Sequence, residues 1–66
     1  MNNYVKENRI RLEITQQELA DLLNVSRQTV FSIETGKYVP STILSLKISR
    51  LFKRKVEEIF MLEEDD

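Results

Sequence analysis

Apolar residues recur three and four positions apart along most of this 66-residue chain, which is the spacing of one face of an α-helix. Turn-forming residues separate the apolar stripes from one another. The pattern predicts helices over about 3–13, 16–23, 26–35, 41–52 and 56–60. We therefore expect an all-α fold of five helices, and a chain of this length allows one domain.

The second and third predicted helices carry clear start and stop signals. Thr15 and Glu18 have the spacing of a capping box, in which each side chain accepts a hydrogen bond from the backbone N–H of the other. Asn24 tolerates the left-handed backbone that ends a helix, and Ser26 is suited to cap the helix that follows. Gly36 supplies the positive φ at which a helix commonly ends. These signals predict two short helices joined by a tight turn.

The exposed face of the third predicted helix carries side chains suited to reading the edges of DNA bases. Arg27 is able to form a bidentate pair with guanine, and Gln28 one with adenine. Thr29 and Ser32 are short enough for hydrogen bonds or for contact with a thymine methyl group, although Thr29 is equally able to bond to its own helix. Phe31 either presses on a thymine methyl group or packs as a partly buried residue. These positions are the candidate base-reading residues.

Six correctly spaced elements of the chain resemble the Cro/phage-repressor (XRE) family of helix-turn-helix transcriptional regulators. They are Arg9, TQQELA at 15–20, VSRQT at 25–29, IETGK at 33–37, Pro40-Ser41 and EEIF at 57–60. The resemblance implies a five-helix λ-repressor-like domain with its helix-turn-helix at 15–36, a repressor that reads the major groove of double-stranded DNA with helix 26–35. The ending is similar to that of small cytolysin-repressor-like regulators, which implies a C-terminal dimer contact and a short terminal β pairing.

The resemblance also implies an ion pair between Arg9 and Glu34, which would tie the first helix to the third. The alternative is that both side chains reach solvent. Contacts with DNA phosphates are expected at the start of the second helix, where backbone N–H groups and the helix dipole favour anions, and just after the third helix. The candidate phosphate-binding residues are Gln16, Gln17, Lys37, Tyr38, Ser41 and Thr42.

The formal net charge of −1 averages two unlike parts of the chain. Residues 1–55 contain all ten basic side chains and five acidic ones, which gives +5, whereas residues 56–66 contain six acidic side chains and no basic one, which gives −6. The basic part suits a phosphate-bearing partner despite the low overall charge. We divide the chain into a DNA-binding domain at 1–62 and an acidic tail at 63–66, which either keeps the protein in solution or repels DNA from the wrong side.

The apolar run at the C-terminal end is longer than one small core needs. A chain below about 70–80 residues rarely builds a core worth more than about 3–5 kcal/mol, so added burial through self-association is expected. Exposed apolar patches usually mark interfaces. We expect a homodimer on a pseudo-palindromic operator. Its expected interface residues are Ile59, Phe60, Met61 and Leu62.

Composition argues against several other classes of protein. The chain has no Cys and no His, so it lacks the usual thiolate and imidazole groups for metal binding or catalysis, and we expect no enzyme, cofactor or metal site. No apolar run approaches the ~20 residues of a membrane span, and no signal peptide is visible, which predicts a cytoplasmic protein without a membrane partner. The open alternative is a protein-interaction module, such as the antitoxin of a toxin–antitoxin pair, whose tail or C-terminal patch binds a partner protein.

Overall fold

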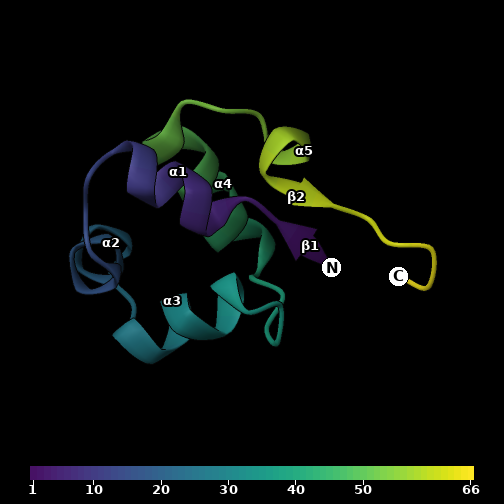
Figure 1. Ribbon diagram of the computed structural model, residues 1–66, viewed down its shortest axis with the longest axis horizontal. Coiled ribbons are helices and arrows are strands. Elements are labelled where there is room, and N and C mark those ends of the chain that lie inside the picture. The colour runs from purple at the N-terminus through teal and green to yellow at the C-terminus, as the bar shows by residue number, and fades with distance from the viewer.

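The computed structural model describes residues 1–66 and arranges five helices and a two-stranded sheet around one core (Figure 1). In chain order the elements are β1 Asn2–Asn3, α1 Val5–Arg11, α2 Gln16–Leu23, α3 Arg27–Glu34, α4 Thr42–Phe52, α5 Val56–Ile59 and β2 Phe60–Met61. The predicted five-helix fold with a short terminal β pairing is confirmed. None of the helices has the length and apolar character needed to cross a membrane.

Local capping explains where α2 and α3 begin and end. The Thr15 hydroxyl accepts from the Glu18 backbone N–H at 3.0 Å, and the Glu18 carboxylate accepts from the Thr15 backbone N–H at 2.8 Å. The Ser26 hydroxyl caps α3 by accepting from a backbone N–H in its first turn at 3.1 Å. Asn24 has φ 58° and Gly36 has φ 78°, so both predicted left-handed positions are confirmed.

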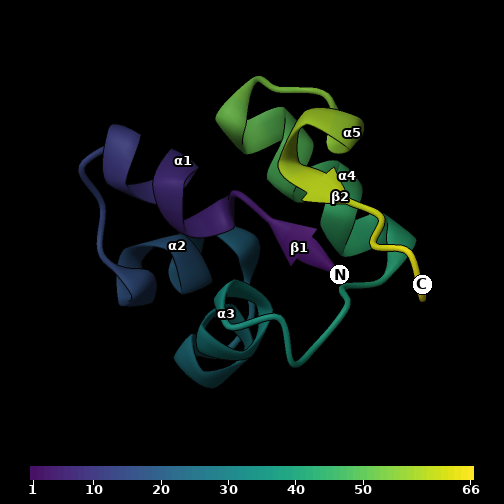
Figure 2. The ribbon, with the colours of Figure 1, turned by 45° about the vertical axis from the view of Figure 1, so that its right-hand side comes forward.

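The two ends of the chain meet in the small sheet. Strands β1 and β2 pair antiparallel with Asn3 opposite Phe60, and the Tyr4 backbone N–H donates to the Ile59 carbonyl at 2.7 Å. The Asn3 side-chain amide also donates to the Ile33 carbonyl at 2.8 Å, near the end of α3. Strand β1 therefore lies between α3 and β2 and connects them (Figure 1 and Figure 2).

The core draws on every helix. Eleven apolar residues are buried: Val5, Leu19, Ala20, Leu23, Val30, Ile33, Leu44, Ile48, Phe52, Ile59 and Phe60. Burying one large apolar side chain contributes about 1.5–3 kcal/mol to stability. Because these residues come from helices far apart in the sequence, the core holds α3 in place through contacts with the rest of the domain.

Two leucines that fit the helical spacing of apolar residues, Leu22 and Leu12, lie outside the core. Leu22 is 61% exposed, because the buried side of α2 runs through Leu19, Leu23 and Ala20, and the 100° step per residue turns Leu22 away. Leu12 is also exposed, because α1 ends at Arg11. The prediction of a helix over 3–13 was too long at both ends, since residues 2–3 form β1.

Candidate nucleic-acid interface

Helix α3 runs along one edge of the molecule, and α1, α4 and α5 all lie on the same side of it (Figure 1). The turn between α2 and α3 is short because Asn24 reverses the chain and Ser26 starts the next helix at once. Val25 in this turn is partly buried against the core. The N-terminal end of α3 is thereby held in a fixed direction, with one face toward solvent.

Three of the candidate base-reading side chains form the outer face of α3. Arg27, Gln28 and Phe31 are exposed and together line a shallow hollow. No acidic side chain of the chain forms an ion pair with Arg27, so its guanidinium is available to a ligand. Phe31 is 41% exposed, and its ring is therefore accessible rather than covered by the core.

The two short side chains of this group are less accessible. Thr29 is half-buried, and its hydroxyl lies 2.9 Å from the Ser26 hydroxyl at the helix cap. Ser32 is also half-buried, and its hydroxyl accepts from the Gln28 amide at 3.5 Å. The structure therefore separates an outer set of base-reading candidates from an inner pair that supports the helix start and the Gln28 side chain.

The glutamines at the start of α2 have their side-chain amides bound within the chain. The Gln16 amide donates to Glu34 at 3.1 Å, and the Gln17 amide donates to Asp21 at 2.9 Å. The first backbone N–H groups of a helix have no partner inside the helix. What Gln16 and Gln17 offer to an anion is therefore chiefly their backbone N–H groups.

The loop after α3 presents the other phosphate-binding candidates. Lys37 and Tyr38 are exposed, and their backbone N–H groups both donate to the Ser32 carbonyl, at 2.9 and 3.2 Å. The Ser41 hydroxyl accepts from the Leu44 backbone N–H at 3.2 Å, which caps α4 and leaves its own proton free to donate. Thr42 is exposed at the first position of α4. These residues follow α3 directly, whereas Gln16 and Gln17 precede it.

A largely buried ionic network fixes α3 to the rest of the domain. Arg9 donates to Glu34 from Nε at 2.7 Å and from Nη2 at 3.3 Å, and its Nη1 donates to the Ile14 carbonyl at 3.0 Å. The Glu34 side chain is only 4% exposed. Such a bidentate pair is directional as well as strong. Together with the Gln16 amide it joins α1, α2 and α3 at one point, and the part played by Gln16 was missed at the level of sequence.

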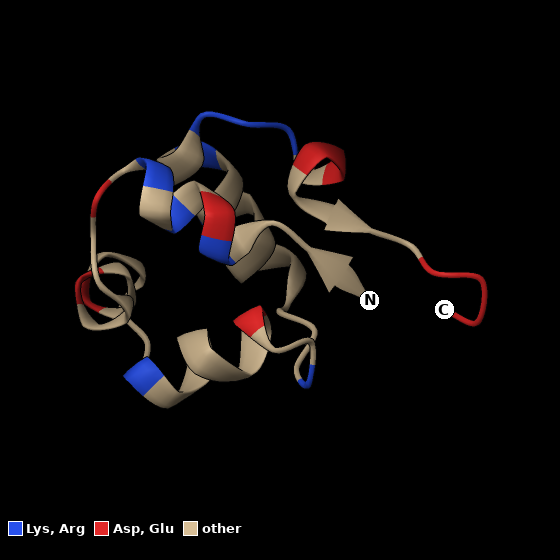
Figure 3. Ribbon diagram, viewed as in Figure 1, with Lys and Arg blue, Asp and Glu red and all other residues tan.

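Charge is distributed unevenly around this surface (Figure 3). Basic residues begin α3 and follow its end, at Arg27 and Lys37, while the acidic residues 63–66 project from the body beyond β2 (Figure 3). No group of three acidic, His or Cys side chains is placed to hold a metal ion. The surface therefore offers free hydrogen-bond donors and positive charge, which suit a phosphate backbone and base edges.

The apolar C-terminal run divides into an inner and an outer half. Ile59 is 0% exposed and packs inside the monomer core, which corrects the expectation that it faces a partner; Phe60 is 8% exposed, so it packs in the core and presents only one edge at the surface. The core accommodates them because α5 and the pairing of β1 with β2 turn both side chains inward. Met61 is half-buried and Leu62 is 83% exposed, so the outer half of the run offers most of the surface that is available to a partner.

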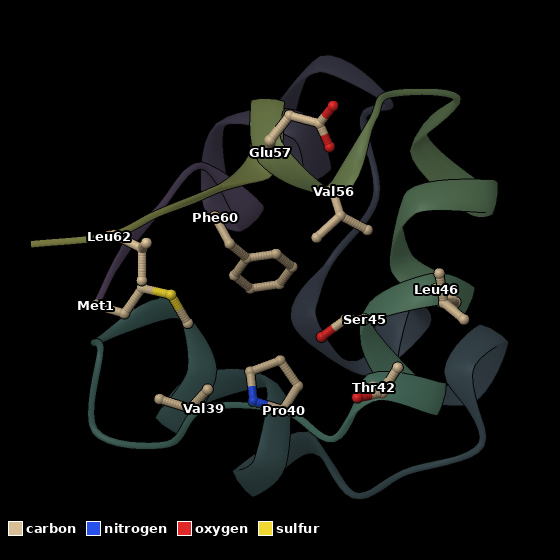
Figure 4. A pocket seen from close by; sticks show the side chains of 10 residues that line it. All are labelled: Met1, Val39, Pro40, Thr42, Ser45, Leu46, Val56, Glu57, Phe60 and Leu62. Atoms are coloured by element: carbon tan, nitrogen blue, oxygen red, sulfur yellow. The ribbon is translucent and has the colours of Figure 1, made fainter. Parts of the chain in front are cut away.

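An open apolar groove lies beside Leu62 (Figure 4). Most of its lining residues were not predicted from the sequence to be interface residues. Its volume is about 400 Å³, and in Figure 4 its side chains surround the Phe60 ring. Val39 and Leu46 are large exposed apolar residues at this groove. The lining residues are Met1, Val39, Pro40, Thr42, Ser45, Leu46, Val56, Glu57, Phe60 and Leu62. Two features of the sequence could have indicated this groove. Val39 is an apolar residue in a loop, and Leu46 is an apolar residue outside the buried stripe of α4.

The sequence pattern of the helix-turn-helix family matches residues 5–59. The HTH-type transcriptional regulator YgzD of Bacillus subtilis, described as uncharacterized, is 48% identical over 66 residues that cover the whole of both chains. An HTH-type transcriptional regulator of Methanocaldococcus jannaschii is 47% identical over the whole of both chains. One of Archaeoglobus fulgidus is 42% identical, and the match covers all of this chain and 93% of the relative.

Proposed function

We propose that this chain, which belongs to the XRE-type helix-turn-helix family of transcriptional regulators and binds DNA, is a repressor that acts as a homodimer on a pseudo-palindromic operator. The observation that carries the proposal is the free, exposed face at the start of α3, held in place by the Arg9–Glu34 network. The repressor role, and membership of the small cytolysin-repressor-like subgroup, rest on the resemblance of the chain's ending to such regulators.

In this proposal the outer face of α3 enters the major groove. Arg27 pairs with guanine O6 and N7, and Gln28 pairs with adenine N6 and N7. Phe31 contacts a thymine methyl group, which suits an exposed ring on the same face. Thr29 and Ser32 have short side chains and are half-buried. They reach base edges only where the groove approaches α3 closely, and their hydroxyls also support the outer residues.

Phosphate contacts flank this helix on both sides. The backbone N–H groups of Gln16 and Gln17 bind one phosphate at the α2 N-terminus, where the helix dipole favours an anion. Lys37, Tyr38 and Ser41, together with Thr42 at the first position of α4, bind phosphates along the loop that follows α3. These contacts set the position and orientation of α3 on the duplex, while the base contacts select the sequence.

The proposed dimer uses the groove of Figure 4 together with Met61 and Leu62. An exposed leucine next to an apolar groove allows two copies to cover each other's apolar surface about a two-fold axis. Two α3 helices then read half-sites about 34 Å apart, one turn of the duplex. A partner protein that covers the same groove is the second candidate, as in an antitoxin, and the exposed Val39 and Leu46 favour neither occupant over the other.

Selection of bound duplexes from a random DNA library tests this function directly. We expect recovered sites with dyad symmetry and half-sites one helical turn apart. If the dimer neutralises about six phosphates, the slope of log K against log salt lies near −5. Failure to recover any duplex, or binding that does not respond to salt, would contradict the proposal, and sites without dyad symmetry would favour the partner-protein alternative.

A further inference from the structure

A second groove lies on another face of the molecule, between the C-terminal end of α2 and the C-terminal half of α4. Its volume is about 470 Å³, and it shares no residue with the groove of Figure 4 or with the outer face of α3. Leu22 and Leu51 supply its apolar surface, and Leu22 is a highly exposed leucine outside the core. Lys47, Arg50 and Lys53 supply its charge, and no acidic side chain lines it.

The three basic side chains of this groove have no acidic partner in their own chain. None of them takes part in an ion pair, and all three are exposed. They also lie outside the surface proposed to contact DNA, since none of the proposed base-reading or phosphate-binding residues lines this groove. An apolar surface surrounded by unpaired positive charges suits a segment that offers an apolar side chain followed by several carboxylates.

The chain carries one segment of that chemistry. Leu62 is highly exposed and is followed directly by four acidic residues, Glu63, Glu64, Asp65 and Asp66. The Glu63 backbone N–H donates to the Asp66 carboxylate at 2.7 Å, which shapes these residues into a turn. The segment extends beyond β2 (Figure 3), and the Glu63 and Asp66 carboxylates pair with the N-terminal ammonium at 3.6 and 3.7 Å, which leaves Glu64 and Asp65 free. Leu62 matches the apolar part of the groove, and the free carboxylates of Glu64 and Asp65 match its charges.

The segment is unable to reach the groove of its own molecule. Helix α2 and the C-terminal end of the chain lie at opposite ends of the long axis, along which the molecule extends 32 Å (Figure 1). The residues 62–66, fully extended, span about 17 Å. An occupant from this chain must therefore come from another copy.

We propose that the segment 62–66 of one molecule, here called the acidic segment, binds the basic groove of a second molecule. Two different surfaces then meet, so the contact is heterologous and does not close within a pair. Each molecule keeps a free groove at one end and a free acidic segment at the other. Because Leu62 serves both contacts, a molecule whose acidic segment is bound in this way takes its Leu62 out of the dimer interface proposed above, and the head-to-tail contact alone builds species larger than two. This association weakens with added salt because the paired charges are exposed.

Sedimentation velocity of the full chain without DNA tests this contact. In about 0.05 M salt the wild-type protein should form species larger than a dimer as its concentration rises, and in about 0.5 M salt it should lose them. The double variant Lys47→Glu/Arg50→Glu should weaken this association about tenfold, since two exposed charge pairs become repulsive. The double variant Glu64→Lys/Asp65→Lys should do the same.

Mixing the groove variant with the segment variant is the decisive experiment, because the changed groove of one is again opposite in charge to the changed positions in the segment of the other. The groove of the first, which is now net negative, faces the two lysines introduced into the segment of the second, and the unchanged basic groove of the second accepts the unchanged segment of the first. The mixture should regain the larger species, which a misfolded variant is unable to do. The matched control is Lys6→Glu/Lys55→Glu, which makes the same change of net charge outside the groove and should associate like the wild type.

Three results would overturn the proposal. The first is a mixture that fails to regain the larger species, and the second is a control variant that loses them equally. The third is a groove variant that associates normally but binds operator DNA more weakly, which would assign the groove to phosphate binding. Because the association is measured without DNA, its failure leaves the DNA-binding proposal untouched.

Discussion

The face of α3 and the groove beside Leu62 expose side chains of different chemistry, mostly polar on α3 and mostly apolar in the groove. The α3 face presents a free guanidinium, an amide and one aromatic ring, and a buried ionic network behind it leaves α3 little freedom to move. The groove beside Leu62 presents mostly apolar side chains, which come from the start of α4 and the loop before it, from α5 and β2, and from the two ends of the chain. Polar donors on a rigid support suit nucleic acid, whereas open apolar surface suits another protein.

The two regions are nevertheless joined by one short segment. Strand β1 pairs with β2 on one side, and the Asn3 amide donates to the Ile33 carbonyl near the end of α3 on the other. Strand β1 therefore links β2 to the end of α3 through hydrogen bonds. The predictions below break each region separately.

The largest expected effect comes from removing the support behind α3. Glu34→Ala leaves the Arg9 guanidinium buried without its partner, which typically costs about 3–5 kcal/mol of unfolding free energy. For so small a domain this lowers the melting temperature by more than about 10 °C, measured by circular dichroism. The control Glu64→Ala removes an exposed carboxylate without a partner and should leave the melting temperature unchanged. A thermally indifferent Glu34→Ala would show that the network contributes little.

The next largest effect concerns the apolar groove. Leu62→Asp, like Met61→Asp, should give monomers whose operator affinity falls at least about tenfold, because a single half-site binds weakly on its own. Helicity should stay close to that of the wild type, since Leu62 lies outside the core. Ile43→Asp is the matched control, because Ile43 is an exposed apolar residue outside this groove. Light scattering that reports Leu62→Asp as a dimer would contradict the assignment of the interface.

A smaller and more uniform effect is expected from the loop after α3. Lys37→Ala removes one phosphate contact, so it should weaken binding to all duplexes alike and reduce the salt slope by about 1. Titrations of operator and unrelated duplexes at several salt concentrations measure both quantities. A loss confined to the operator would instead place Lys37 among the base-reading residues.

The elements that were predicted well are those specified by neighbouring residues. The capping box of Thr15 and Glu18, the left-handed Asn24 and the terminal Gly36 each depend on chemistry within one turn of helix, so their roles follow from local sequence. The spacing of Arg27 and Gln28 directly after a capping serine placed them on an exposed helix start for the same reason.

The features that were missed depend on contacts between distant parts of the chain. Leu22 fits the apolar period of α2, yet it is 61% exposed because the side of α2 that the rest of the domain covers is centred on Leu19, Ala20 and Leu23. The inward position of the Gln16 amide depends on where Glu34 arrives, and the burial of Phe60 depends on its pairing with Asn3. Helical periodicity contains no information on which element covers which face.

The base preference of Arg27→Ala, compared with that of the wild type by selection from the same random duplex library, decides whether the start of α3 reads bases. If α3 reads the major groove as proposed, the variant loses preference at one position in each half-site, at a cost of about 1–3 kcal/mol there, and keeps the rest of the operator. If Arg27→Ala lowers affinity evenly and leaves every base preference unchanged, Arg27 contacts phosphate and the proposed reading of the operator by the start of α3 is contradicted.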